Sequence, residues 1–211
     1  MKILALETSS ESASVALLDG ERVVERSVAG NPGHSETILP EILRLLNDAG
    51  LALGEVDAIA FGAGPGAFTG LRVACGIAQG LAVAAGLPVV PVCGLEAMAA
   101  TVGERRVLSL LDARMGEVYA AAYVLGGSGH ELQGEIRLAS PEAVELPAGT
   151  GWVACGNAPA AYPLLKSNLA LNFSQVGLIT FVFQGTASVL QPLVGLYTDR
   201  RPLPYAMSAG M

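Results

Sequence analysis

The sequence predicts an α/β fold with two similar lobes, and three observations support this fold class. The first is a series of short apolar runs, broken by serine and by Asp-Gly in the manner of an antiparallel meander, at 2–6, 13–18 and 22–28. The second is a buried strand at 56–61 that leads through glycines into an apolar helix at 70–85. The third is a strand–acid–turn–strand pattern that begins at Val107, repeats the outline of the first hairpin and predicts a second lobe.

Both helices predicted for the first lobe have broad apolar surfaces. The helix at 35–49 begins with Ser35 and carries acids in its early turns, and its apolar residues cover more than one stripe. Such a surface predicts burial on two sides, either by the sheet and another helix or by a partner. In the helix at 70–85, Gly76 and Gly80 lie one helical turn apart and would let another helix or the sheet approach closely.

The glycine-rich segment at 62–70 has two interpretations. A strand, a glycine loop and a helix start together form an anion site, because backbone N–H groups converge there and the helix dipole adds positive potential. Alternatively, the glycines only permit a tight turn and close helix–sheet packing. A P-loop is excluded because no lysine follows the last glycine, and a dinucleotide fingerprint because no acid occurs from Ala82 to Leu95. The possible anion- or nucleotide-binding residues are Thr8, Ser9, Gly64, Gly66, Thr69, Gly70 and Asp112.

Histidine and cysteine spacing argues against a metal centre. His34 and His130 stand in loop-like settings without a second His, Cys or acid at ligand spacing, so the sequence predicts no metal site. Cys75, Cys93 and Cys155 are far apart in apolar surroundings and form no CxxC pair. They are typical of packed thiols in a reducing compartment.

No catalytic residue is assigned from the sequence. Glu7 and Asp112 each follow the first strand of a hairpin and could form a pair of carboxylates suited to metal or acid–base chemistry. The alternative for Glu7 is a turn residue that caps backbone amides. Arg72, just after the glycine loop, could pair with an anion or, in a structural ion pair, with an acid such as Asp112.

Five segments resemble the TsaB family, which supports threonylcarbamoylation of tRNA in bacteria. They follow one another in the family's order over residues 1 to about 165: MKILALETSSESASVALLDG, GHSETILPEI, GAGPGAFTGLRVACGIAQGL, LLDARMGEVYAAAY and TGWVACGNAPAAYP. The resemblance implies the ASKHA fold, which actin, Hsp70 chaperones and sugar kinases share and in which each lobe begins with such a hairpin. It assigns 1–102 to the first lobe and 103–165 to a second lobe that is truncated, because the family's final residues are missing.

The resemblance also implies a function. It predicts a non-catalytic scaffold or dimerisation subunit that binds and supports the catalytic subunit TsaD, with TsaC and TsaE in the same pathway and a homodimer as a further possibility. The paired metal-binding histidines of TsaD correspond to Gly94 and Met98, so ATP and metal are expected in the partner and no tightly bound cofactor here. The partner-binding residues expected on the two helices are Ile38, Ile42, Leu45, Leu46, Arg72, Ile77 and Leu81. The alternatives are an ATPase or a peptidase of the same fold.

Residues 166–211 do not resemble the TsaB family. No charged residue occurs from 167 to 198, a length that suffices to cross a bilayer as a helix. The segment resembles part of a major-facilitator transporter of the fosmidomycin-resistance type, whose cytoplasmic loop is matched by Gly195, Asp199 and Arg200. The sequence therefore predicts an apolar helical tail that directs the chain to membrane or aggregation, and a non-functional fusion is a further alternative.

The charge of the chain changes at the same point as the resemblance, near residue 165. Residues 1–165 hold nine Lys or Arg and eighteen Asp or Glu, while the remainder holds three bases and one acid. An acidic segment repels a phosphate backbone, so tRNA is expected to bind only through a partner. No signal peptide precedes the first strand-like run, and a cytoplasmic location is expected for residues 1–165.

Overall fold

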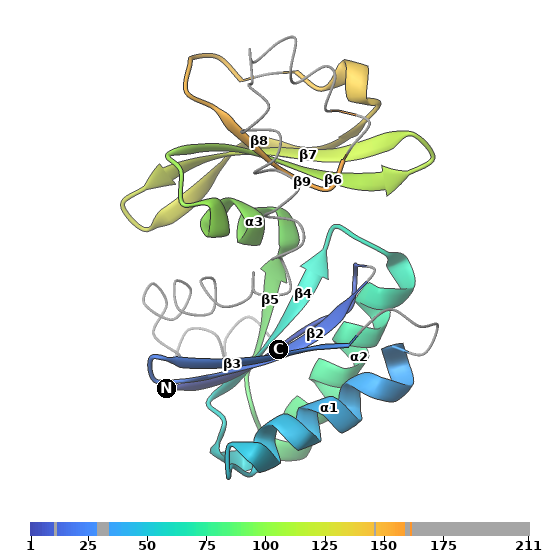
Figure 1. Ribbon diagram of the computed structural model, residues 1–211, viewed down its shortest axis with the longest axis vertical. Coiled ribbons are helices and arrows are strands. Elements are labelled where there is room, and N and C mark those ends of the chain that lie inside the picture. Colours follow the sequence, from blue (N-terminus) through green and yellow to red (C-terminus); the bar gives the residue numbers. More distant parts are fainter. Residues whose placement is uncertain (11, 29–33, 146, 159–160, 162–211) are drawn as a thin grey trace. The chain divides into compact units, whose positions relative to one another are not determined.

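The computed structural model describes residues 1–10, 12–28, 34–145, 147–158 and 161. The described residues form two compact units, Met1–Gly94 and the part that begins at Leu95. The apolar tail predicted at 166–211 lies outside the described residues. Figure 1 shows one sheet in each unit.

The first unit contains a five-stranded sheet in the order β3-β2-β1-β4-β5. Strands β1, β2 and β3 form the antiparallel meander, and β4 and β5 extend the sheet in parallel with β1. Parallel neighbours require crossover connections, which the helices supply. The bounds of the strands are Lys2–Glu7 for β1, Ala13–Asp19 for β2, Arg22–Val28 for β3, Ala58–Gly64 for β4 and Val89–Cys93 for β5.

Helices α1 (His34–Asp48) and α2 (Phe68–Ala85) cover the same face of this sheet (Figure 1). A short 3₁₀ turn, η1 (Leu53–Glu55), precedes β4. Alternate residues of β1 and β2 point toward the helices, as the two-residue period of a strand requires. The core beneath the helices includes Leu4, Leu6, Val15, Leu17, Ile38, Ile42, Leu45, Ile59, Ala74 and Ala78.

The second unit repeats the plan of the first. Its four-stranded sheet has the order β8-β7-β6-β9, with β6, β7 and β8 antiparallel and β9 parallel to β6. Helix α3 (Gly94–Val102) leads into this sheet, and the Ser109 hydroxyl on β6 donates a hydrogen bond of 2.8 Å to the Leu95 carbonyl. The remaining elements are β6 (Arg106–Arg114), β7 (Glu117–Gly126), β8 (Gly129–Ala139), η2 (Pro141–Ala143) and β9 (Val153–Gly156).

These sheets confirm the predicted α/β fold of the ASKHA class with two related lobes, because each pairs an antiparallel meander with a parallel strand beside its first strand. Three local predictions were wrong. The strand expected at 56–61 runs instead to Gly64, so part of the glycine loop is strand. The second helix begins at Phe68 rather than at Gly70. His130, expected in a loop, lies in β8, where it is buried and its Nε2 is 2.8 Å from the Glu104 carbonyl oxygen.

Candidate functional site on the first unit

The loop between β4 and α2 is only three residues long, because Gly64 ends the strand and Phe68 begins the helix. Gly64 has a φ of 102°, which only glycine adopts without strain. Ala67 caps the helix without a side-chain hydrogen bond, and its carbonyl accepts the Leu71 N–H at 2.9 Å. The helix therefore begins close to the end of the strand.

The turn after β1 packs directly against this loop. The Thr8 hydroxyl donates a hydrogen bond of 2.6 Å to the Gly70 carbonyl, and the Ala67 N–H donates one of 2.8 Å to the Ser9 carbonyl. A Cβ at Gly70 would overlap the Thr8 carbonyl, and one at Gly66 would lie 2.6 Å from the Ser9 hydroxyl oxygen. Close packing thus accounts for the glycines at both positions. Anion binding by these residues, by Gly64 and by Thr69 stays a prediction.

Glu7 ends β1 and acts as a cap of the turn that follows. Its carboxylate accepts a hydrogen bond from the Ser9 N–H, which is the alternative role considered for this residue. The carboxylate also lies over Gly62 of β4, where any Cβ would overlap it. Glycine at position 62 therefore leaves the space that the Glu7 carboxylate occupies.

In the second unit, Asp112 has the role that Glu7 has in the first. Its carboxylate accepts a hydrogen bond of 2.8 Å from the N–H of Arg114, two residues further along the chain. Its own N–H donates to Asn157 Oδ1 at 2.9 Å, which joins the ends of β6 and β9. Arg114 and Met115 at the tip have positive φ values of 68° and 54°. The repeat between the lobes thus includes the acid that caps each turn.

Helix α1 has an inner and an outer apolar stripe. Four of the predicted partner-binding residues form the inner stripe and are buried in the core of the first unit: Ile38, Ile42, Leu45 and Leu46. Because these side chains pack against the sheet, they do not present a surface to a partner, and the expectation of direct contact does not hold for them. The outer stripe is formed by Leu39 and Leu43, which are 41% and 56% exposed.

Helix α2 is apolar apart from Thr69, Arg72 and Gln79, but it buries only one narrow stripe. It is the one helix among the described residues that is long and apolar enough to cross a membrane, by length and composition alone, yet only 22% of its residues are buried. The buried stripe has small residues at four-residue spacing, Gly70, Ala74, Ala78 and Ala82. This spacing places one residue per turn against the sheet.

The remaining predicted partner-binding residues lie on different sides of α2. Ile77 and Leu81 are half-buried against the core, while Arg72 is exposed. Phe68 and Val83 are 66% and 85% exposed. Together with Leu39 and Leu43 they make up what we call the helical face, defined by Leu39, Leu43, Phe68, Arg72 and Val83.

Phe68 and Arg72 form a stacked pair at the start of α2. The Arg72 guanidinium carbon lies 3.9 Å from the centroid of the Phe68 ring. One helical turn separates the two residues, which brings their side chains to the same side of the helix. Arg72 forms no ion pair with any described residue, so the structural ion pair considered for it is not present there.

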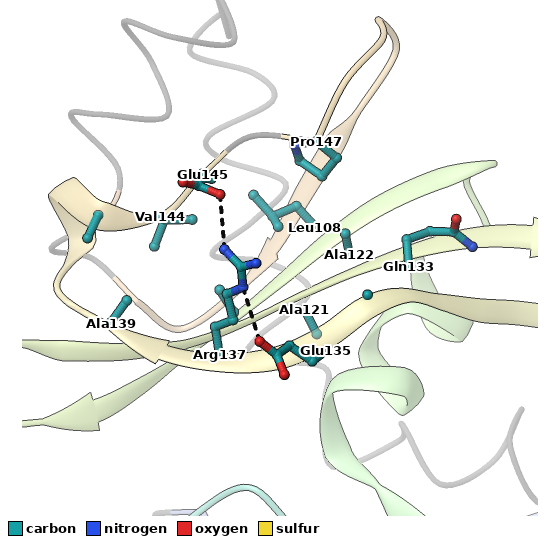
Figure 2. A pocket seen from close by; sticks show the side chains of 13 residues that line it. Leu108, Ala121, Ala122, Gln133, Glu135, Arg137, Ala139, Val144, Glu145 and Pro147 are labelled. Atoms are coloured by element: carbon teal, nitrogen blue, oxygen red, sulfur yellow. Dashed lines mark hydrogen bonds and ion pairs between the residues drawn. The ribbon is translucent and has the colours of Figure 1, made fainter.

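The second unit has an open pocket of about 190 Å³ on the face of its sheet formed by Leu108, Ala120 and Ala122. Figure 2 shows Arg137 between the side chains of Glu135 and Glu145 at its rim. The guanidinium lies 3.7 Å from Glu135 and 3.0 Å from Glu145. Arg137 is the one basic side chain among the described residues that line this pocket, and it is paired with two carboxylates, which disfavours an anionic ligand there.

The three thiols and the possible metal ligands are dispersed. Cys155 is buried on β9, and burial raises the pKa of its thiol to about 11, against a smaller opposite effect of the Ser109 hydrogen bond. Cys75 and Cys93 are half-buried. Within the described ranges, no group of three or more His, Cys, Asp or Glu side chains could hold a metal ion.

Comparisons with known proteins relate the chain to one family. Residues 29–199 match the family model described as TsaD: tRNA N6-adenosine threonylcarbamoyltransferase. The tRNA threonylcarbamoyladenosine biosynthesis protein TsaB of Escherichia coli is 40% identical over 73% of this chain and 73% of its own length. The protein of the same name from Haemophilus influenzae is 49% identical over 59% of this chain, but the chain spans only 54% of that relative.

The chain is also similar to a solved structure and, over a shorter stretch, to a transporter. The structure of YeaZ from Pseudomonas aeruginosa is 42% identical, with a TM-score of 0.68, over 72% of this chain and 74% of its own. An uncharacterized MFS-type transporter, YfnC of Bacillus subtilis, is 47% identical over 53 residues, 25% of this chain and 13% of its own length. A partial likeness to a transporter therefore accompanies the main one, as predicted from the sequence.

Proposed function

Because the chain belongs to the TsaB family, we propose that it is a non-catalytic subunit of the complex that makes threonylcarbamoyladenosine in the anticodon loop of tRNA. Its role is to bind the TsaD-type catalytic subunit and to support that subunit's activity. Family membership supports a part in this biosynthesis. The match to the family model described as tRNA N6-adenosine threonylcarbamoyltransferase supports a part in the same modification.

The observation that carries the scaffold role is the helical face. Leu39, Leu43, Phe68 and Val83 are large, apolar and exposed, and they lie on two helices that cover the same face of one sheet. A contiguous patch of exposed apolar side chains marks a protein interaction site, and in this proposal these residues contribute to one such surface. The exposed glycines Gly76 and Gly80, at which a Cβ would meet nothing within 4 Å, would allow a helix of the partner to approach α2 closely.

In this proposal the partner supplies the chemistry. The chain has a net charge of −7, which disfavours direct contact with the phosphates of tRNA. ATP and the metal ion are held by the catalytic subunit, and TsaE acts through the complex. The same helical face could mediate self-association in the absence of the partner.

Binding of the purified full chain to the TsaD-type subunit of the same organism tests the proposal. We expect Leu39→Asp and Leu43→Asp to weaken the complex by more than tenfold, because each buries an unpaired charge in the interface. The matched control is Leu132→Asp, at an exposed leucine of the second unit. A chain that does not bind the catalytic subunit, or that binds with unchanged affinity after both substitutions, would contradict the proposed contact.

A further inference from the structure

We propose that the Phe68–Arg72 stack is the part of the helical face that contributes most to affinity, and that it receives a carboxylate of the catalytic subunit. This inference rests on the proposed function and adds the chemistry of the partner's surface. It concerns the side chains of Phe68 and Arg72, in which the guanidinium carbon lies 3.9 Å from the centroid of the ring.

Phe68 has the properties of an apolar interface residue with a large energetic effect. It is 66% exposed although it begins a helix whose other end and inner stripe are packed against a core. Aromatic residues and arginine are enriched among the few residues that dominate binding energies. Stacking against Arg72 restricts the rotation of both side chains before binding, so less conformational entropy is lost when the partner docks.

The charge of Arg72 indicates which group of the partner it would bind. It is the only charged residue of α2, and no described residue offers it a carboxylate. By contrast, Arg44 on α1 pairs with Glu41, and Arg26 on β3 pairs with Glu41 and Asp48. A guanidinium that stacks on a ring through its face keeps its N–H groups at the edge for hydrogen bonding. A planar carboxylate fits that edge, since it can accept two parallel N–H···O bonds.

The geometry therefore assigns two complementary features to the partner, a recess for the phenyl ring and an aspartate or glutamate beside it. A second copy of this chain fits less well. Two copies related by a two-fold axis through this region would bring two unpaired arginines together, and like charges at an interface are unfavourable.

The test measures the affinity of the full chain for the catalytic subunit by calorimetry. We expect Phe68→Ala to weaken binding about 30-fold and Arg72→Met about tenfold. The double variant should lose less affinity than the product of the two single fold-losses, because each residue orders the other. Arg72→Met should also reduce the salt dependence of the dissociation constant, which a purely structural role would not change. Arg22→Met, at an exposed arginine on β3, is the matched control.

Each outcome distinguishes this inference from the function on which it rests. If Phe68→Ala and Arg72→Met bind within twofold of the wild type while Leu43→Asp is impaired, the stack has no special role. If Leu43→Asp binds normally as well, the contact through the helical face fails with it, whereas a wild-type chain that does not bind the catalytic subunit at all overturns the proposed function. If Phe68→Ala abolishes self-association in sedimentation but leaves partner binding unchanged, the stack belongs to a homodimer and the inference is overturned. Circular dichroism of each variant verifies the fold.

Discussion

The Thr8 hydroxyl donates a hydrogen bond of 2.6 Å to the Gly70 carbonyl, although the two residues are separated by 62 positions in the chain. The contact joins the turn after β1 to the first turn of α2. It places the start of α2, and with it Phe68 and Arg72, at a fixed position beside the sheet. The packing of the glycine loop therefore fixes the position of Phe68 and Arg72 on the helical face.

We expect Gly70→Ala to destabilise the first unit by about 2 kcal/mol, because the new Cβ would overlap the Thr8 carbonyl. Gly76→Ala in the same helix is the control. Its Cβ would meet nothing within 4 Å, so it should stabilise the protein by about 1 kcal/mol through helix propensity. Urea unfolding of both variants measures the difference. Equal effects of the two substitutions would show that the close contact at Gly70 does not exist.

Thr8→Val keeps the shape of the side chain and removes only its hydrogen bond to Gly70. Because Thr8 is buried, we expect a loss of about 1 kcal/mol in the free energy of unfolding. Ser10→Ala removes an exposed hydroxyl in the same turn and should change the stability by less than about 0.5 kcal/mol. A Thr8→Val variant as stable as the wild type would argue against the contact.

Ile42 and Leu43 are neighbours in sequence, but substitution of the first should affect stability and substitution of the second should affect partner binding. Ile42 is fully buried, so Ile42→Ala should lower the free energy of unfolding by about 3 kcal/mol. Leu43 is 56% exposed, and Leu43→Ala should leave stability within about 0.5 kcal/mol while weakening the complex. Thermal unfolding and partner binding, measured on both variants, separate the core from the interface. A normal complex with Leu43→Ala would count against the outer stripe.

Cys155 predicts a pH dependence of stability. Burial raises the pKa of its thiol from 9.0 to about 11, so the unfolded chain loses this proton at a lower pH than the folded one. The contribution to stability is complete below about pH 9 and decreases as the pH rises toward 11. We expect the wild type to lose about 2 kcal/mol more than Cys155→Ala between about pH 8 and pH 10.5. Parallel pH profiles of the two proteins would contradict the burial of this thiol.

The sequence predicted β1 to β4 and both helices that cover the first sheet, because their periodicities are strong. It could not tell which of the two apolar stripes of α1 faces the sheet. Ile42 and Leu43 are both large and aliphatic, and only the tertiary structure decides which is buried. The signal that could have identified Leu39 and Leu43 is their own four-residue spacing, which forms a second stripe beside that of Ile38 and Ile42.

Other features were missed for different physical reasons. Strand β8 is an edge strand with polar residues on both faces and an irregular register near Gly134, so it lacks a clear two-residue apolar period. Phe68 was overlooked because the helix was expected to begin at Gly70. The two roles of the glycine loop could not be separated from spacing, since close packing and anion binding both require glycine.

The most direct test of the scaffold role is the formation of threonylcarbamoyladenosine in tRNA by the TsaD-type subunit and the other pathway proteins, with and without this chain. The full chain alone should form no product. Added to its partners, it should raise the rate of product formation, and Leu43→Asp should raise it much less than the wild type at equal concentration. An unchanged rate when the wild-type chain is added, or product formed by the chain alone, would contradict the account.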